Sequence, residues 1–394
     1  MKICILSTYP PAKCGIAEYA GELVQALRNR NIKVRVIAVD QGVERLSYPS
    51  TVKYVVNRDD MKDYLEAAKR VNHMGVDAVL IQHEYGIFGG EWGSYLLEFM
   101  ERVRAPIVTT LHTTVPPFDE VMGEVTRQIL ELSDMITVMS RGSLKVLDRY
   151  YGVNGRYKIR VVPHGVRSIP TEGRRLIRAE LGISDRFVML TIGFLGPNKG
   201  IEYAIKALPK IQRYVDNILY LIVGIVHPKS RVFYGDSYYK KLVRLTTRLG
   251  VEDKVLFINK FPDKEEYVRY IVASDVMVLP YIDKMQVSSG TLSYALSYGK
   301  AVVATPFVYA RDLLSGGRGI LCKFKDPDSI AEAVIRLAED PELKAEIETK
   351  ALECGLKLRW EVVVEDFLGV FMDVVLRKLI GGVAHVAPTY AQVS

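Results

Sequence analysis

The chain has 394 residues, of which 49% are hydrophobic, and a formal net charge of +7. This length predicts two or three domains rather than one hydrophobic core. The composition excludes a disordered chain, no apolar run approaches the roughly 20 residues of a membrane span, and the scattering of lysines and arginines among acidic residues argues against a nucleic-acid partner.

The start of the chain leads directly into a proline-rich loop and leaves no room for a signal peptide. We therefore expect a cytoplasmic protein, with contact between its basic surface and the inner face of a membrane as an alternative. The cysteines are Cys4, Cys14, Cys322 and Cys354. They form no CxxC pair and have no histidines at metal-ligand spacing, which predicts small buried residues and no metal site, although Cys14 lies in a loop where it could react.

Apolar runs alternate with amphipathic segments along the first half of the chain. Lys2–Leu6 predicts a buried strand, and after a Pro/Gly loop Glu18–Leu27 has its apolar residues on one helical face. Further strands are expected at Lys33–Val39, Ala78–Gln82, Ile107–Leu111, Met135–Met139 and Arg160–Val162. These runs are continuously apolar rather than alternating, which is typical of parallel strands covered by helices on both faces.

The pattern changes at a polar segment, Val166 to Asp185, which predicts a connection with a short helix inside it. A second β/α series begins at Phe187–Ile192. Its further strands are expected at Ile218–Val223, Val255–Ile258, Val276–Leu279, Ala301–Ala304 and Gly319–Cys322. A long apolar helix follows from Trp360 to about Leu379, and the small, polar tail over 381–394 is expected to be flexible.

Two serial β/α series predict an α/β fold with two Rossmann-like, doubly wound domains, over residues 1–166 and 167–359. Ligands of such sheets bind beyond the carboxyl ends of the strands. Two facing domains would therefore form an inter-domain cleft, where the ligand site is expected.

The loop after the first strand contains Gly15 where the first helix opens. A glycine there lets backbone N–H groups approach an anion at the positive end of the helix, although an ordinary connecting loop would look the same. The GxGxxG pattern is missing, which disfavours a nucleotide-dependent oxidoreductase.

Polar residues follow two later strands of the first series. His83 and Glu84 come directly after one strand and open a glycine-rich loop that ends at Gly90, which favours substrate recognition by a loop close to a ligand. His112 follows the next strand, where an imidazole could bind a sugar hydroxyl or a phosphate. The alternative for each is a structural role, which we favour for His164 at the domain connection.

The second series carries two candidate phosphate sites. Lys199 lies on a glycine-rich loop after the first strand of the series, which suits a diphosphate, and the P-loop pattern is absent. Ser288, Ser289, Gly290 and Thr291 come directly before a helix. They offer hydroxyls, free N–H groups and the helix dipole, and helix capping is an equally good reason for their presence.

Nearly the whole chain resembles the retaining glycosyltransferases of the GT-B fold, in glycosyltransferase group 1 (family four). The loop Gly193–Gly200 is similar to the family's "GRL…KG" segment, and Leu292–Thr305 to its "LEAMACGTPVVAS" segment. Gly317–Cys322 and Asp326-Pro327 are similar to its "G-x-G-x-LV…D-P" stretch. The resemblance implies that the helix at about 360–380 crosses back onto the first domain, which binds the acceptor, while the second domain binds the nucleotide-sugar.

The resemblance also implies roles for individual residues. Lys199 would pair with the donor diphosphate, together with Gly15 and the hydroxyl and N–H groups of Ser289, Gly290 and Thr291. His112 matches the family's histidine near the reacting sugar, so His112 and Lys199 are the expected catalytic residues. Substrate contacts are expected from His83, Glu84, Gln286 and Ser288. No cofactor or metal is expected, since the nucleotide-sugar is a co-substrate.

The chain departs from the family pattern at two places. Phe194 stands where the family has an arginine, and the paired glutamates spaced Glu-x7-Glu would fall at Met285 and Ser293. Gln286 is the expected substitute for a missing glutamate.

These features predict a metal-independent, retaining hexosyltransferase that uses a donor such as GDP-mannose or UDP-glucose and a sugar or polyol acceptor. A GT-B phosphorylase or reversible disaccharide synthase is the first alternative, because the glutamates are missing. A non-catalytic nucleotide-sugar-binding protein is the second. The sequence predicts neither the acceptor nor the oligomeric state.

Overall fold

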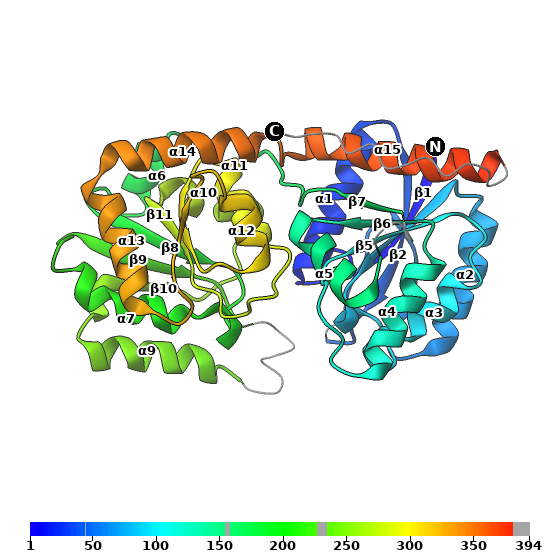
Figure 1. Cartoon of the computed structure of the whole chain (residues 1–394), viewed down its shortest axis with the longest axis horizontal. Coiled ribbons are helices and arrows are strands. Elements are labelled where there is room, and N and C mark those ends of the chain that lie inside the picture. The colour runs from blue at the N-terminus through cyan, green and yellow to red at the C-terminus, as the bar shows by residue number, and fades with distance from the viewer. Residues whose placement is uncertain (44, 154–157, 227–234, 381–394) are drawn as a thin grey trace.

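The computed structural model describes residues 1–43, 45–153, 158–226 and 235–380. It contains a seven-stranded and a six-stranded sheet, which lie side by side in Figure 1. Every strand pairing among these residues is parallel. The predicted α/β fold with two Rossmann-like halves is therefore confirmed, and the predicted flexible tail, 381–394, lies outside the described residues.

The first sheet has the strand order β3-β2-β1-β4-β5-β6-β7, so the direction of winding reverses between β1 and β4. Its elements are β1 (Lys2–Ser7), α1 (Gly15–Asn29), β2 (Lys33–Asp40), β3 (Val52–Asn57), α2 (Met61–Met74), β4 (Ala78–His83), α3 (Tyr95–Met100), β5 (Ile107–Leu111), α4 (Glu120–Leu132), β6 (Met135–Val138), α5 (Arg141–Tyr151) and β7 (Ile159–Val161). Such a reversal opens a crevice at the carboxyl edge of the sheet.

Strand β3 is the strand of this sheet that the sequence analysis did not predict. It lies at the edge of the sheet and pairs only with β2. Apart from Val56, its residues are exposed or half-buried, so its apolar residues do not form a continuous run. An edge strand with one solvated face lacks the pattern by which the buried strands were identified.

The second sheet has the order β10-β9-β8-β11-β12-β13, with its reversal between β8 and β11. Its elements are α6 (Arg174–Glu180), β8 (Phe187–Ile192), α7 (Ile201–Ile211), β9 (Ile218–Val223), α9 (Ser237–Leu249), β10 (Val255–Ile258), α10 (Lys264–Ala273), β11 (Val276–Leu279), α11 (Gly290–Ser297), β12 (Ala301–Ala304), α12 (Val308–Leu314), β13 (Ile320–Leu321), α13 (Pro327–Glu339) and α14 (Pro341–Leu356), followed by α15 (Trp360–Leu379). All strands expected in the second series are present.

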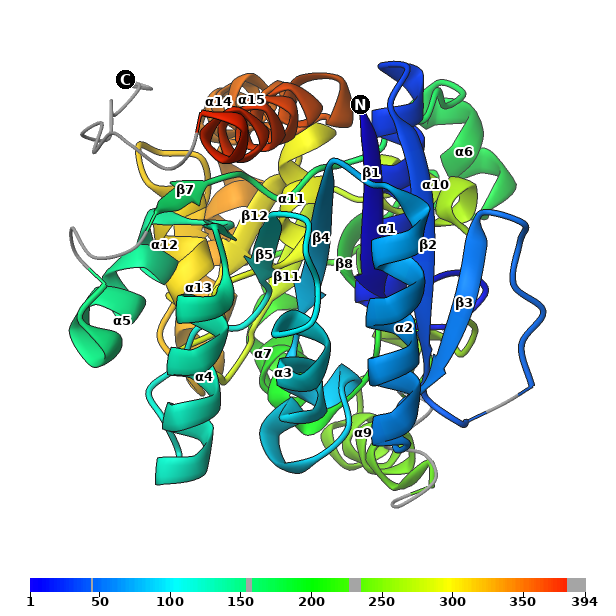
Figure 2. The ribbon, with the colours of Figure 1, turned by 90° about the vertical axis from the view of Figure 1, so that its right-hand side faces the viewer.

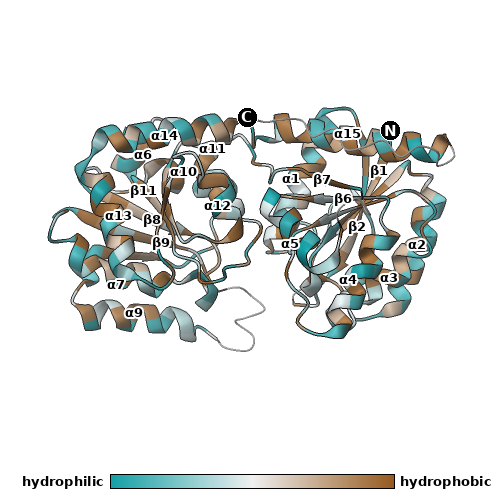
Figure 3. Cartoon of the chain, viewed as in Figure 1, coloured by the Kyte–Doolittle hydropathy of each residue, from teal (hydrophilic) through white to brown (hydrophobic). Residues whose placement is uncertain are grey.

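Helices cover both faces of the first sheet. Ile3 and Ile5 of β1 pack in the same core cluster as buried residues of α1 and α15, whereas Cys4 and Leu6 pack with buried residues of α2, α3 and α4. Figure 2 shows α2, α3 and α4 along one face of this sheet, and Figure 3 shows that the central strands are mostly hydrophobic. The continuous apolar runs in the sequence follow from this coverage.

The two halves are joined by two chain segments that pair with each other. Val166 N–H donates to the carbonyl of Leu358 at 2.8 Å, and Trp360 N–H donates to the carbonyl of Val166 at 3.0 Å. Helix α15 then packs on the first half against α1, β4 and β5, while α14 runs along the second (Figure 1). The assignment of acceptor and donor binding to these halves stays a prediction.

In the part of the chain that the structure describes, no helix is long and apolar enough to cross a membrane. The cytoplasmic location and the contact with a membrane surface stay predictions.

Candidate active site

A cavity of about 640 Å³ lies between the two sheets. It is lined by loops that follow the carboxyl ends of β1, β2, β4 and β5 on one side, and of β8, β10 and β11 on the other. We call the lining residues from 12 to 164 the N-terminal wall and those from 192 to 294 the C-terminal wall. All of the predicted contact residues line this cavity except His83.

Lys199 supplies a positive charge on the C-terminal wall. It ends a short 3-10 turn, Pro197–Lys199, and its Nζ lies 4.0 Å from the centre of the Tyr281 ring. A cation–π contact of this kind positions an ammonium group without neutralising it. No carboxylate among the described residues pairs with Lys199, so its charge is available to an anionic ligand.

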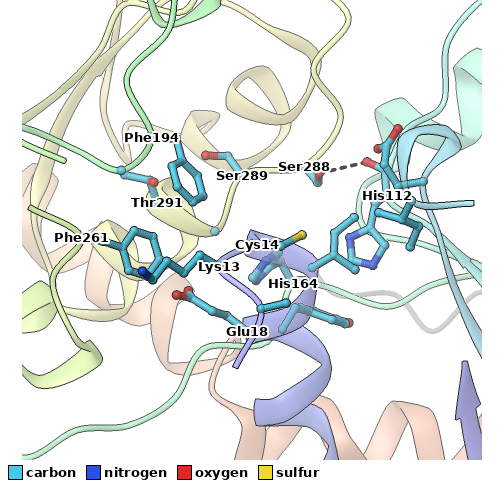
Figure 4. A pocket seen from close by; sticks show the side chains of 18 of the residues that line it. Lys13, Cys14, Glu18, His112, His164, Phe194, Phe261, Ser288, Ser289 and Thr291 are labelled. Atoms are coloured by element: carbon cyan, nitrogen blue, oxygen red, sulfur yellow. Dashed lines mark hydrogen bonds between the residues drawn. The ribbon is translucent and has the colours of Figure 1, made fainter. Parts of the chain in front are cut away.

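The N-terminus of α11 lies on the same wall, as Figure 4 shows for Ser289 and Thr291. The Ser289 side chain accepts from Leu292 N–H at 3.2 Å, so the predicted helix cap is present. Gly290 and Thr291 are the first helical residues, whose N–H groups have no partner within the helix. Two backbone donors, the helix dipole and Lys199 thus favour an anion at this wall.

Close packing across the cleft explains Gly290. A β-carbon there would lie 3.3 Å from the ring of His164 on the opposite wall. Ser288 also spans the cleft, because its hydroxyl donates to the carbonyl of His112 at 3.0 Å (Figure 4). The hydroxyl of Ser288 therefore joins the two walls, and the predicted contact of Ser288 with a substrate stays a prediction.

His112 faces the cavity from the N-terminal wall. Its Nε2 lies 2.8 Å from Oε1 of Gln82, and the edge of the Tyr19 ring packs against it with centroids 5.0 Å apart. Burial, followed by the nearby His164 and His83, lowers the pKa of His112 to about 3. The imidazole is therefore neutral near pH 7, and because the Gln82 oxygen can only accept, the proton is on Nε2 and Nδ1 is unprotonated.

Glu84 lines the same wall directly after β4. Its carboxylate accepts a short hydrogen bond from the Thr113 hydroxyl and further bonds from the N–H groups of Tyr85 and Gly86. Burial raises the pKa of Glu84 above its usual range, and these donors oppose the rise. The side chain is thus held rigidly beside His112 and Thr113, at the rim of the cavity.

His83 does not contribute to the cavity surface. Its ring is 1% exposed and lies against Tyr85 and Phe88, with centroid distances of 4.9 and 6.0 Å. Burial lowers its pKa to about 3. The last residue of a buried strand points into the core rather than the cleft, so we do not propose a direct substrate contact for His83.

The glycines after His83 also have a structural explanation. A β-carbon at Gly89 would lie 1.9 Å from the carbonyl oxygen of Arg58, and Gly90 has a φ of 76°. Only Gly86 of this group lines the cavity. We expected this glycine-rich loop to lie close to a ligand. That prediction is wrong for the second half of the loop, where glycine is needed for packing against the protein.

The loop before α1 completes the N-terminal wall. Cys14 is the N-cap residue of α1, but its side chain makes no capping bond, so the N–H groups of the first turn are open beside the exposed Gly15. Lys13, which the sequence analysis did not single out, is exposed and lines the cavity (Figure 4). This loop therefore adds N–H donors and a cation next to the C-terminal wall.

The expected positions of the missing glutamates are wrong by one residue. Met285 and Ser293 do not line the cavity, and Ser293 is fully buried with its hydroxyl 2.8 Å from that of Tyr309. Gln286 and Tyr294 keep the same spacing and do line the cavity. The family's glutamate positions therefore correspond to glutamine and tyrosine here, which supports Gln286 as a substitute.

A charged link among residues that line the cavity joins the two walls. Nζ of Lys264 lies 2.7 Å from Oε2 of Glu18 and 3.5 Å from Oε1 of Glu22. The Tyr294 hydroxyl donates to Glu22 at 2.7 Å, and the Trp360 indole N–H donates to its other oxygen at 2.9 Å. Burial opposes the charge of Lys264, but the two glutamates outweigh it and raise the pKa of the ammonium. Single-sequence patterns contain no signal for this link, because its members are far apart in the chain.

A second missed feature is aromatic. The rings of Phe194 and Phe261 stack with centroids 5.1 Å apart on the C-terminal wall (Figure 4). Phe194 thus takes part in an apolar pair where the resemblance places an arginine. Over the described residues, no group of three or more His, Cys, Asp or Glu side chains could hold a metal ion.

Comparisons with known proteins agree with this geometry. The family profile described as "Glycosyltransferase Family 4" matches residues 14–168, and the profile "Glycosyl transferases group 1" matches residues 173–353. A D-inositol 3-phosphate glycosyltransferase from Acidothermus cellulolyticus is 26% identical over 92% of this chain and 86% of its own length. An N-acetyl-alpha-D-glucosaminyl L-malate synthase from Bacillus anthracis is 25% identical over 71% of each chain.

Solved structures show the same fold. Sucrose-phosphate synthase from Thermosynechococcus elongatus has a TM-score of 0.79 at 18% identity and covers 95% of this chain and 99% of its own. HepE from Anabaena, in complex with UDP, has a TM-score of 0.75 at 18% identity and covers 95% and 100%. Two profiles that together span both halves, and a GT-B fold, lead to one conclusion: the chain belongs to the group 1, family four glycosyltransferases.

Proposed function

We propose that this glycosyltransferase moves a hexosyl group from a nucleoside-diphosphate sugar, of the GDP-mannose or UDP-glucose type, to a hydroxyl group of a sugar or polyol. The transfer proceeds with retention at the anomeric carbon and without a metal ion. The observation that carries the proposal is the ammonium of Lys199, which pairs with no carboxylate of the described residues, beside the open N-terminus of α11 in a cavity of about 640 Å³.

The names of similar proteins support a nucleotide-sugar donor. A relative from Mycolicibacterium smegmatis, 29% identical over 55% of this chain, is a GDP-mannose-dependent mannosyltransferase. The structure of Anabaena HepE has also been solved in complex with UDP-glucose. Both donors carry a diphosphate, which the C-terminal wall suits, while neither comparison decides the base or the sugar.

The leaving group determines the main catalytic need. As the bond between the anomeric carbon and the phosphate oxygen breaks, negative charge builds up on the diphosphate. The ammonium of Lys199, the N–H groups of Gly290 and Thr291, and the first turn of α1 at Gly15 would stabilise that charge. Fixed donors in a site that excludes water are worth more than the same donors in solution. They supply the charge that a metal ion would otherwise supply.

His112 is proposed to act at the reacting sugar. Its unprotonated Nδ1 can accept a hydrogen bond from a sugar hydroxyl, and Gln82 fixes the orientation of the ring. Gln286 replaces one family glutamate with an amide that can still bind a hydroxyl. The acceptor hydroxyl would enter from the N-terminal wall, on the face that the diphosphate leaves, and would give its proton to the departing phosphate oxygen as the new glycosidic bond forms, which gives retention.

A screen of nucleotide-sugars tests the proposal. We expect one or more donors to raise the melting temperature and to be hydrolysed in a protein-dependent way, with activity unchanged by EDTA. NMR of the first-formed product should show the anomeric configuration of the donor. Stabilisation by inorganic phosphate or a sugar phosphate, with no response to any nucleotide-sugar, would instead establish the phosphorylase alternative.

A further inference from the structure

The strand ends of the N-terminal wall carry carboxylates. Asp40 ends β2 and Glu84 follows β4, and both side chains line the cavity. Oδ1 of Asp40 accepts from Gly42 N–H at 2.9 Å, and Glu84 is held by the Thr113 hydroxyl. Neither carboxylate forms an ion pair among the residues that the structure describes. Two carboxylates that pair with no described cation therefore line the N-terminal wall of the cavity.

The histidines of this wall do not offset those charges. Burial is the main cause that lowers the pKa of His112 to about 3 and that of His164 to about 4, so both rings are neutral near pH 7. The imidazoles thus offer hydrogen bonds to hydroxyl groups and no positive charge.

The lysines near this wall are committed elsewhere. Lys264 is paired with Glu18 and Glu22. Lys13 is the one cation that the described N-terminal wall contributes, and it belongs to the loop beside Gly15. In the view of Figure 4 it lies with Phe261 and Glu18, on the far side of Cys14 from His112. Among the described residues, no cation is therefore paired with Asp40 or Glu84.

We infer that the acceptor is an uncharged, polyhydroxylated molecule, and that Asp40 and Glu84 select against phosphorylated and carboxylated acceptors. This inference rests on the proposed function, since it assigns the acceptor to the N-terminal wall. Hydroxyl groups of a sugar or polyol can donate to both carboxylates, and hydrogen bonds to a charged acceptor atom are the strong ones. A phosphate ester would place like charges side by side in a partly desolvated site, which is a means of rejecting a wrong ligand.

Matched pairs of ligands test the inference by binding, without the need for turnover. Saturation-transfer NMR on the full-length protein would compare myo-inositol with its 3-phosphate, glucose with glucose 6-phosphate, and glycerol with glycerol 3-phosphate. We expect at least one neutral member to bind and its phosphate ester to bind at least 10-fold more weakly. A phosphate ester that binds as tightly as its neutral partner, or a panel in which no neutral member binds, overturns the inference.

Charge-neutral variants locate the selection. Asp40→Asn and Glu84→Gln should each lower the ratio of the affinity for a neutral ligand to that for its phosphate ester by about 10-fold, which is about 1.4 kcal/mol. Glu66→Gln removes a carboxylate on α2 that is paired with Arg70, and it should leave the ratio unchanged. An affinity ratio that changes equally in all three variants contradicts selection by the carboxylates of the N-terminal wall. Sugar transfer is measured in the same mixtures as a separate test of the proposed function. A preference for neutral ligands without any sugar transfer would contradict the proposed transferase activity and leave the inference about ligand charge standing.

Discussion

The two walls of the cleft differ in their charged and polar groups. The C-terminal wall presents Lys199, which pairs with no described carboxylate, and an open helix N-terminus. The hydroxyl of Thr291 on this wall lies 3.0 Å from that of Tyr267. The N-terminal wall presents neutral histidines and carboxylates at its strand ends. One wall is suited to an anion and the other to hydroxyl groups.

This contrast indicates how a transferase can separate its substrates. A diphosphate gains charge during the reaction and needs cations and N–H donors, while an acceptor hydroxyl needs orientation by groups that accept hydrogen bonds. Variants on the C-terminal wall should therefore have the larger effects on the transfer rate. Variants on the N-terminal wall should change kcat or the choice of acceptor and leave the affinity for the nucleotide nearly unchanged.

Lys199→Ala is the strongest test of the contrast. We expect the transfer rate to fall about 100- to 1,000-fold, since removal of one preorganised charge donor costs about 3–4 kcal/mol in comparable sites. The melting temperature should stay within a few degrees of the wild type, because Lys199 makes no ion pair with any described residue. The measurement is kcat/KM with the donor found in the screen, together with calorimetry of the nucleoside diphosphate.

Lys206→Ala provides the matched control. Its ammonium lies 5.2 Å from the Tyr203 ring on α7 and does not line the cavity. The control should keep wild-type kinetics. Unchanged turnover of Lys199→Ala at saturating donor would remove Lys199 from the proposed machinery.

His112→Ala should have the next largest effect. We expect kcat to fall about 10- to 100-fold, while the affinity for the nucleoside diphosphate changes by less than about 3-fold, because a neutral imidazole contributes to the reacting sugar rather than to the anion. The experiment compares kcat with the dissociation constant of the nucleotide. A loss of nucleotide affinity alone would show that His112 binds the diphosphate, and the two walls would then not differ in function as we expect.

The fold was predictable because buried parallel strands have a simple signature. Strands such as Ala78–His83, which opens with four apolar residues, and Ile218–Val223 are buried at every residue, so their apolar runs are visible in a single sequence. Lys199 and Ser289–Thr291 were predictable for a related reason, since the loops that join the carboxyl ends of parallel strands to the following helices gather at one edge of the sheet. The edge strand β3 lacks that signature and was missed.

The rest of the site depends on distances between segments that are remote in the chain. Lys264 and Glu18 meet across 246 positions, and their pairing requires both halves to be in place. Whether Ser293 or Tyr294 faces the cavity depends on a one-residue shift in α11, which rotates the exposed face by about 100°. His83 and Glu84 are neighbours, yet one points into the core and one into the cleft, because successive side chains leave a strand on opposite faces.

Lys264→Met tests the link between the walls. We expect the free energy of unfolding to fall by about 1–2 kcal/mol, because Glu22 is left with a side chain only 10% exposed and without its cation. Partial exposure of Glu18 limits the effect. Chemical denaturation measures it. Lys260→Met breaks an exposed pair with Glu266 and should cost less than about 0.5 kcal/mol. Equal losses in both variants would show that the cross-wall pair is no stronger than a surface pair.

The smallest expected effect is the contribution of the neutral, buried His83 to the pH dependence of stability. Burial lowers the pKa of His83 to about 3, against about 6.5 in an unfolded chain. Between those values the unfolded chain binds the extra proton, so stability falls as the pH drops below about 6.5. At pH 6 this amounts to about 0.8 kcal/mol for one histidine.

His83→Leu isolates that contribution, because His83 packs in the core and does not line the cavity. The difference in unfolding free energy between pH 7.5 and pH 6 should shrink by about 0.8 kcal/mol in the variant, whatever its stability at pH 7.5. His73→Leu is the control, since His73 is exposed on α2 and lies outside the cavity lining. An unchanged pH dependence in His83→Leu would mean that His83 can be charged in the folded protein, and the neutral character of this half of the site would then have to come from His112 and His164 alone.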